Sequence, residues 1–218
     1  MVNIGAGTLS CASDFLMGNN ATRNKLVFSG PGILQISGNS STIANGQFTA
    51  STGTIDYNGT VAQNILALSY YHLKCSGSNI KSLSANTVVA GSLSIAGAAQ
   101  LDVTAVNNYS LSVAGNWDIT STDADPFLER AATVTFNGAS GLQTISTPLS
   151  QETFYNLTIN NNAGNSGADV EFNKNCYVSQ TYNHTSGKVD LKGNSLNVIS
   201  QNNTGSFITC NLTGGSII

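Results

Sequence analysis

The sequence has few charged residues: Asp, Glu, Lys and Arg make up 9% of its 218 residues, against about 25% in an ordinary globular domain. Its eight Lys and Arg are scattered along the chain, and the formal net charge is −3. A protein that binds nucleic acid needs a basic stripe to contact the phosphates. The scarcity of basic residues therefore argues against nucleic acid as a partner.

Long apolar runs and helical periodicity are also absent. No segment approaches the roughly 18 consecutive apolar residues of a membrane-spanning helix, which predicts no membrane insertion. No window keeps its apolar residues at a spacing of about 3.6, and the abundant Gly, Asn, Ser and Thr are poor residues for helix interiors. An all-β fold is therefore predicted.

The two ends carry no export or capping sequence. The first residues, MVNIGAGTLS, lack the basic stretch and the apolar run of a signal peptide. The last residues, NLTGGSII, continue a strand-like pattern, and neither end has a charge or a proline that would block strand pairing. We expect a segment of a longer exported protein, with flanking repeats as neighbours and open ends that favour end-to-end association.

Cysteine is present four times, as Cys11, Cys75, Cys176 and Cys210, but never as a CxxC pair. Thiolate metal sites use paired spacing, so zinc is not expected. The simplest interpretation is four small buried apolar residues, with disulfides between coils as the alternative in an oxidising compartment. Cys75 aligns with Ile159 in the repeat described next, and we predict that it is buried and unbridged.

What the chain does contain is a degenerate internal repeat. The segment TIDYNG at 54–59 returns as TVTFNG at 133–138, and YYHLKC at 70–75 returns as FYNLTI at 154–159. The matches keep their order, while the distance between the two copies drifts slightly along the chain. The predicted organisation is a single solenoid segment over 1–218, comprising a partial repeat at 1–45, a full repeat at 46–124 and a second repeat, truncated at its end, at 125–218.

Within the repeat, short apolar alternations are bounded by Gly, Asn or Ser, which is strand patterning. Strands this short suit a right-handed parallel β-helix, or β-solenoid, of about nine or ten coils. Tandem immunoglobulin-like β-sandwiches are the alternative, although they use longer strands. The predicted inward residues are Leu93, Leu111, Val134, Phe136, Leu157, Leu191 and Leu196.

The repeated motif has a physical interpretation as a strand, a corner and the start of the next strand. Asn137 and Gly138 are expected to form the corner, because both residues tolerate a positive φ. Gln143 follows after a short loop, as Gln63 does in the first copy. A glutamine at this place can satisfy backbone groups that the bend leaves unpaired. The motif therefore describes scaffold and contains no catalytic residue.

These segments also carry a resemblance. GNW at 115–117, TVTFNG at 133–138, GLQTIS at 141–146, FYNLTINN at 154–161 and SGKVDLKGNSLNV at 186–198 resemble a repeat of very large secreted or cell-surface proteins of Bacteroidota. The resemblance covers most of 46–213. His72, at the usual Asn of the FYNL motif, and the acidic segment 120–131 depart from it. It implies export and a fibrous or adhesive role at the cell surface, and it does not imply an enzyme.

Few residues are candidates for a site. The aromatics Tyr70 and Phe154 could face a ligand, although placement in the core is the simpler interpretation. An acidic cluster could hold Ca²⁺ through carboxylate oxygens, although a solvated loop is simpler; its members are Asp118, Asp123, Asp125 and Glu129. His72 and His184 are expected to be structural. No catalytic residue and no other cofactor is predicted.

The predicted function is a non-catalytic, extracellular or cell-surface segment of a structural or adhesive fibre, whose ligand would be a polysaccharide or another surface molecule. Three alternatives remain: a glycan-binding adhesin face, a polysaccharide-degrading β-helix enzyme and an ice-binding solenoid. The enzyme needs clustered carboxylates in acid and base roles, and the chain has a single acidic cluster. Ice binding needs aligned Thr-x-Thr rows, and TGT at 52–54 and TVT at 133–135 form no run from coil to coil.

Overall fold

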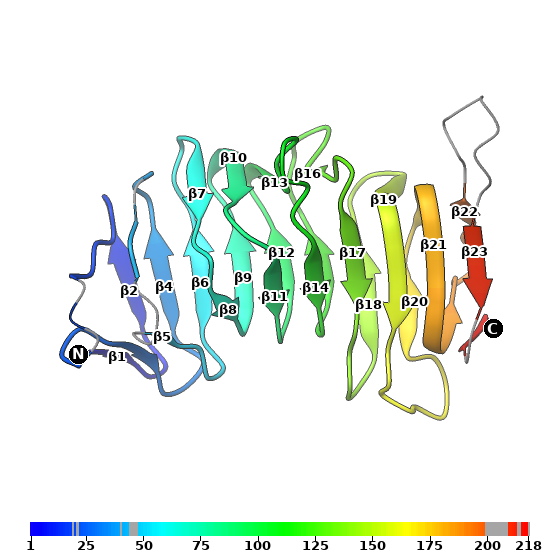
Figure 1. Cartoon of the computed structure of the whole chain (residues 1–218), viewed down its shortest axis with the longest axis horizontal. Coiled ribbons are helices and arrows are strands. Elements are labelled where there is room, and N and C mark those ends of the chain that lie inside the picture. Colours follow the sequence, from blue (N-terminus) through cyan, green and yellow to red (C-terminus); the bar gives the residue numbers. More distant parts are fainter. Residues whose placement is uncertain are drawn as a thin grey trace.

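The structure is a computed structural model in which parallel strands wind into a β-solenoid of about 8 turns (Figure 1). It describes residues 1–18, 20, 22–39, 41–43 and 48–198, together with the backbone of 209–212 and 215–217. These residues form no helix. The strand pairs are parallel along the whole stack. The all-β solenoid is therefore confirmed, and tandem β-sandwiches are wrong because they are built from antiparallel strands.

Three sheets run along the stack. Sheet 1 contains β2 (Thr8–Cys11), β4 (Ile33–Ile36), β6 (Thr54–Tyr57), β9 (His72–Cys75), β12 (Leu93–Ile95), β15 (Trp117–Ile119), β18 (Gln143–Ser146) and β20 (Val170–Phe172). Sheet 2 contains β8 (Ser69–Tyr70), β11 (Thr87–Val89), β14 (Leu111–Val113), β17 (Thr133–Phe136), β19 (Gln151–Asn160), β21 (Asn175–Asp190) and β23 (Thr209–Leu212). Sheet 3 contains β7 (Gln63–Ile65), β10 (Ser78–Leu83), β13 (Ala98–Asp102) and β16 (Phe127–Leu128).

The remaining strands lie toward the two ends of the stack. A small sheet of β1 (Val2–Ile4), β3 (Leu26–Phe28) and β5 (Phe48–Thr49) flanks the first turns. At the other end, β22 (Leu196–Val198) and β24 (Gly215–Ile217) both pair with β21. Figure 1 shows β1 and β2 at one end of the elongated stack and β21 and β23 at the other.

The length of a coil varies along the stack. Register pairs Thr54 with His72 in one coil and Trp117 with Ile145 in another, so the second of these coils is much the longer. Short coils need only the three strands and tight corners. Longer coils carry loops such as TPLSQ at 147–151. Because several coils carry such loops, the chain makes about 8 turns in place of the expected nine or ten.

Inward side chains form apolar rows that cross the strands. In sheet 1 the register aligns Leu73, Leu93 and Trp117, each with no exposed surface. The predicted inward residues Leu93, Leu111, Val134, Phe136 and Leu157 are all buried. Leu191 and Leu196 are only partly buried. Leu191 lies beyond the end of β21, and among the described strands β22, which holds Leu196, pairs only with β21.

The described cysteines behave as small core residues. Cys75 is fully buried and free, which confirms its prediction. Cys176 is buried and Cys11 half-buried, and both are free. Burial raises the pKa of the Cys75 and Cys176 thiols well above the ordinary value. The side chain of Cys210 lies outside the described residues.

The sequence repeat is not a whole number of turns. Tyr57 of the first copy lies on β6 in sheet 1, whereas its counterpart Phe136 lies on β17 in sheet 2. Similarly, Cys75 lies in sheet 1 and its counterpart Ile159 in sheet 2. With three strands per turn, the eleven steps from β6 to β17 make three and two-thirds turns. Equivalent residues of the two copies therefore lie in different sheets. The motif specifies a local corner, which can occur between any two sheets of the solenoid.

Gln143 satisfies the backbone at such a corner, as predicted. Its Nε2 donates to the carbonyls of Val113, at 2.8 Å, and Gly115 in the preceding coil. Its Oε1 accepts hydrogen bonds from the Asn161 side-chain amide at 3.0 Å and from the Gly138 N–H at 3.4 Å. One buried side chain thereby serves two coils and the corner between them.

Gln63 makes the same contacts in the first copy. Its Nε2 donates to the carbonyls of Ile36 and Gly38 at 2.9 and 2.6 Å, and its Oε1 accepts from the Gly59 N–H at 2.9 Å. The role assigned to both glutamines from their spacing is confirmed.

The corner glycine has a different purpose from the predicted one. Neither Asn137 nor Gly138 has a positive φ. A Cβ on Gly138 would instead lie 2.9 Å from the Ala114 carbonyl oxygen and 2.6 Å from Asn161 Nδ2. Glycine is needed here because adjacent coils approach too closely for a side chain. The predicted corner between β17 and β18 is therefore present, but it is formed without a positive φ at Asn137 or Gly138.

Candidate functional site

Sheet 3 is interrupted where the acidic segment of the chain passes. Among the described strands, β16 lies at the edge of this sheet with β13 as its neighbour, while the first half of β19 pairs onward with β21. A cleft of about 410 Å³ lies between them and is lined by 124–127 and 149–153. The hollow therefore coincides with a break in the hydrogen-bonded stack.

Glu152 is a buried acid on the wall of this cleft. It lies at an inward position of β19, in register with Cys176, and only 4% of its surface is exposed. Its Oε2 is buried and has no hydrogen-bond partner. Burial raises the pKa of Glu152 to about 8, and hydrogen bonding to the side chains of Thr147 and Trp117 partly lowers it. The carboxyl is therefore largely protonated at neutral pH.

Trp117 lies in the core next to Glu152. It is fully buried and meets three phenylalanine rings edge to face, with centroid distances of 4.8 Å to Phe127, 5.8 Å to Phe136 and 5.5 Å to Phe154. Its Nε1 is buried and makes no hydrogen bond of ordinary length, but the indole lies near enough to act as a hydrogen-bond donor toward the Glu152 carboxyl. A large aromatic cluster and an acid that lacks full hydrogen bonding thus occupy the same layer of the core.

Two further carboxylates lie around the cleft. Asp125 is exposed on its wall, and both burial and the neighbouring Asp123 raise its pKa. Glu129 is half-buried; burial raises its pKa most, and the charge of Asp125 adds to the effect. The charges of Glu129 and Asp125 also raise the pKa of Glu152. Because Glu152 is largely protonated at neutral pH, the negative charge near the cleft comes from Asp125 and Glu129.

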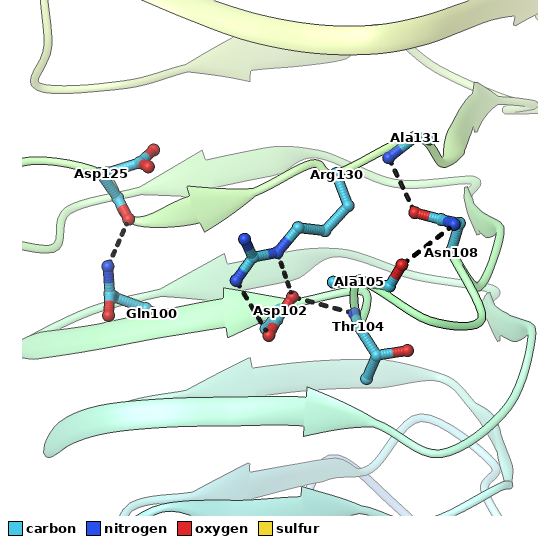
Figure 2. A network of polar contacts seen from close by, with 8 residues as sticks. All are labelled: Gln100, Asp102, Thr104, Ala105, Asn108, Asp125, Arg130 and Ala131. Carbon is cyan, nitrogen blue, oxygen red and sulfur yellow. Dashed lines mark hydrogen bonds and ion pairs between the residues drawn. The ribbon is translucent and has the colours of Figure 1, made fainter.

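The basic residue nearest these acids is already paired, as Figure 2 shows. Arg130 donates from Nε to Asp102 Oδ1 at 3.0 Å and from Nη2 to Asp102 Oδ2 at 3.3 Å. Asp102 Oδ1 also accepts from the Thr104 N–H at 2.9 Å. The adjacent Gln100 donates to the Asp125 carbonyl at 2.9 Å. These contacts tie β13 to the segment around β16, and the charge of Arg130 still acts to lower the pKa of both Asp125 and Glu129.

The structure does not bring the predicted calcium ligands together. Asp118 is exposed on the outer face of β15, whereas Asp123 and Asp125 lie in the loop before β16, where Asp123 accepts a hydrogen bond from Gln100 at 3.1 Å. Over the described ranges, no three Asp, Glu, His or Cys side chains gather in a group that could hold a metal ion. The predicted set of four, which includes Glu129, is therefore not a site.

The predicted ligand-facing aromatics point the other way. Tyr70 and Phe154 are 1% and 0% exposed, which contradicts the prediction that they face a ligand. Tyr70 pairs with Tyr57 through their hydroxyls at 3.0 Å, and Phe154 packs on Trp117. Strand alternation puts them in the core.

Both histidines make structural contacts. His72 Nδ1 accepts a hydrogen bond from the Ser92 N–H at 2.9 Å, and burial lowers its pKa. His184 is buried, with Nδ1 3.2 Å from the Tyr182 hydroxyl and Nε2 2.9 Å from the Gly187 carbonyl oxygen. Neither histidine lines the cleft.

A second surface feature is a ladder on the outer face of sheet 2. Register aligns two rows across β17, β19 and β21, and they consist of Thr133, Asn156 and Thr181, and of Thr135, Thr158 and Asn183. We call these six residues the Thr/Asn ladder. All are half-buried and uncharged, and strand spacing places successive rungs about 4.8 Å apart. The ladder is hard to recognise in the sequence, because its members come from three successive coils. Only one of its strands, β17, has a Thr-x-Thr sequence.

Comparison with protein-family models, with curated proteins and with solved structures finds no match to the chain. Over the described residues, no helix has the length and apolar character needed to cross a membrane. The cleft, the ladder and the strand stack are therefore the features of the molecule that bear on its function.

Sequence reasoning missed Glu152. A signal was present, because the strand QETF alternates and Phe154 is a typical core residue, which places Glu152 on the same inward side. The acid lies outside the cluster of acids in the sequence, and the fold alone brings it next to Asp125.

Proposed function

We propose that the chain is a non-catalytic segment of an extracellular structural or adhesive fibre. The observation that carries this proposal is the uninterrupted parallel stacking of sheet 1 from β2 to β20, which makes each coil a template for the next. The described edge strand β2 pairs on one side only, with β4. Such an edge extends by pairing with another strand, either in flanking repeats or in a second molecule.

The test of this proposal is self-association of the purified chain. We expect the mass measured by light scattering to rise with protein concentration. Ser10→Pro removes a backbone donor from β2 and should reduce the association. Ser10→Ala is the matched control, because it loses the same side-chain hydrogen bond to Gln35, 2.7 Å long, and keeps the backbone. Monomers at all concentrations, or equal behaviour of the two variants, would contradict the proposal, as would turnover of a polysaccharide by the chain.

A second candidate function is binding to ice, which the Thr/Asn ladder favours. An ice surface offers hydroxyl groups at fixed intervals, and a flat face with regularly spaced hydroxyl and amide groups matches such an array better than charged side chains do. The six ladder residues carry no charge and lie on adjacent, hydrogen-bonded strands. The same regularity would suit a crystalline polysaccharide, which the experiment separates.

Thr158→Tyr should abolish ice binding, because a ring at the centre of the ladder lifts the face from a flat surface. Thermal hysteresis and inhibition of ice recrystallisation are the measurements. Thr144→Tyr on the outer face of sheet 1 is the control, since Thr144 is also half-buried and lies off the ladder. Absence of both ice effects in the unaltered chain rejects this candidate, and binding to insoluble polysaccharide that Thr158→Tyr removes would assign the ladder to adhesion.

A further inference from the structure

The chain contains three Asn-Gly pairs, at 45–46, 58–59 and 137–138, and the first of them lies outside the described residues. The other two pairs form corners that follow β6 and β17. An asparagine before a glycine can lose ammonia spontaneously, because the glycine nitrogen can attack the side-chain carbonyl carbon and no Cβ hinders its approach. Both pairs follow an aromatic residue. A difference in their reactivity would therefore come from the fold.

At the first corner both reacting groups are held. The Gly59 N–H donates to Gln63 Oε1 at 2.9 Å. The Ser37 hydroxyl donates to Asn58 Oδ1, also at 2.9 Å. The reaction needs the Gly59 nitrogen to give up its proton and to approach the Asn58 side-chain carbonyl carbon, and each hydrogen bond opposes that change. The first corner is therefore protected.

At the second corner both groups are held less firmly. Asn137 Oδ1 is buried and has no hydrogen-bond partner. The Gly138 N–H reaches Gln143 Oε1 only at 3.4 Å, and that oxygen also accepts from the Asn161 side-chain amide at 3.0 Å. A hydrogen bond of this length is weak. The residues that follow, 139–142, are exposed, which gives water access to the corner.

We propose that Asn137 is a site of spontaneous deamidation, whereas Asn58 is preserved. The Gly138 nitrogen forms a bond to the Asn137 side-chain carbonyl carbon. The bond from that carbon to the side-chain nitrogen breaks, ammonia leaves with the proton of the Gly138 nitrogen, and a succinimide ring remains. One water molecule then opens the ring at either carbonyl and gives aspartate or iso-aspartate. The reaction needs no oxidant, cofactor or second protein.

The modification alters the corner between β17 and β18. Iso-aspartate adds a methylene to the main chain directly before Gly138, and a Cβ on Gly138 would already lie 2.9 Å from the Ala114 carbonyl oxygen. Both products also introduce a negative charge at a half-buried position, which is costly without a partner. The corner should therefore loosen as the protein ages.

Peptide mapping by mass spectrometry, after incubation of the purified chain at mildly alkaline pH, measures the conversion of each asparagine. Asn58 is the internal control. In the folded chain Asn137 should convert at least about fivefold faster than Asn58, which is the rate factor that corresponds to one ordinary hydrogen bond. In concentrated urea the contacts of both corners are lost, and the two rates should become equal.

Ser37→Ala provides a second test, because it removes the contact to the Asn58 side chain and leaves Gln63 in place. It should raise the rate of conversion at Asn58 and leave the rate at Asn137 unchanged. In the unaltered folded chain, an isoaspartyl methyltransferase should label the Asn137 peptide in preference to the Asn58 peptide. The proposal is overturned if Asn137 stays intact in the folded chain while the unfolded chain is converted, or if both asparagines convert at equal rates in the fold.

Discussion

Gln143→Leu should lower the free energy of unfolding by about 4 kcal/mol. The leucine fills a similar space but offers no polar atoms. The carbonyls of Val113 and Gly115 lose their donor, and the amide of Asn161 loses one of its two acceptors. Gln143 is 1% exposed and Asn161 is equally buried, so water cannot replace these contacts. Each buried polar group left without a partner costs about 1 to 3 kcal/mol.

Urea denaturation followed by circular dichroism measures the effect, and Gln35→Leu is the matched control. Gln35 lies on the outer face of β4 and accepts one exposed hydrogen bond from Ser10. Its replacement should change the free energy of unfolding by no more than about 0.5 kcal/mol. Similar losses in the two variants would mean that Gln143 does not organise the corner.

The corner illustrates what local sequence can predict. The distance from the Asn-Gly pair to the glutamine is short, so the backbone groups that need a partner lie within reach of Gln63 and Gln143 whatever the rest of the chain does. The role of Gly138 could not be found in the same way. Its lack of a side chain matters because Ala114 of the preceding coil lies against it, and that neighbour is set by the coil length.

Coil length also explains why comparison of the two repeat copies could not predict which sheet each residue lies in. Tyr57 and Phe136 occupy the same place in the repeat, but loops of different length rotate the second copy by a third of a turn, from sheet 1 to sheet 2. A repeat in sequence therefore does not produce a stripe on one face. The Thr/Asn ladder arises instead from three neighbouring strands of sheet 2, β17, β19 and β21, of which only β17 carries the TVTFNG motif.

Glu152 illustrates a third limit of what the sequence can predict. The loop at 147–150 precedes β19, which does not pair with β16, and a hollow lined by 124–127 and 149–153 lies beside these strands. Acidic residues that are close in sequence, such as Asp118 and Asp123, separate onto a strand and a loop. Glu152 approaches Asp125 from the next coil. The sequence contains the alternation that buries Glu152, but no local pattern predicts which residues of the neighbouring coil lie next to it.

Glu152 should make the stability of the chain depend on pH between about 4.5 and 8. Its pKa rises from 4.5, the ordinary value that applies to the unfolded chain, to about 8 in the fold. An acid with a raised pKa holds its proton in the folded state, so its contribution is fully present below pH 4.5 and is lost as the pH rises through 8. At about 1.36 kcal/mol per pH unit, the loss reaches up to about 5 kcal/mol.

Glu152→Gln should remove this dependence, because the amide stays neutral at every pH. Urea denaturation should give equal free energies of unfolding for the two proteins near pH 4.5. The variant should become the more stable one by up to about 5 kcal/mol near pH 8. Asp125, Glu129 and His72 also have shifted pKa values, but both proteins contain them, so the difference between the proteins isolates Glu152. Cys176, the inward neighbour of Glu152, stays a neutral thiol throughout, because burial raises its pKa. A difference that stays constant from pH 4.5 to 8 would show that Glu152 is ionised in the fold, and the cleft would then hold its charge by contacts other than those described.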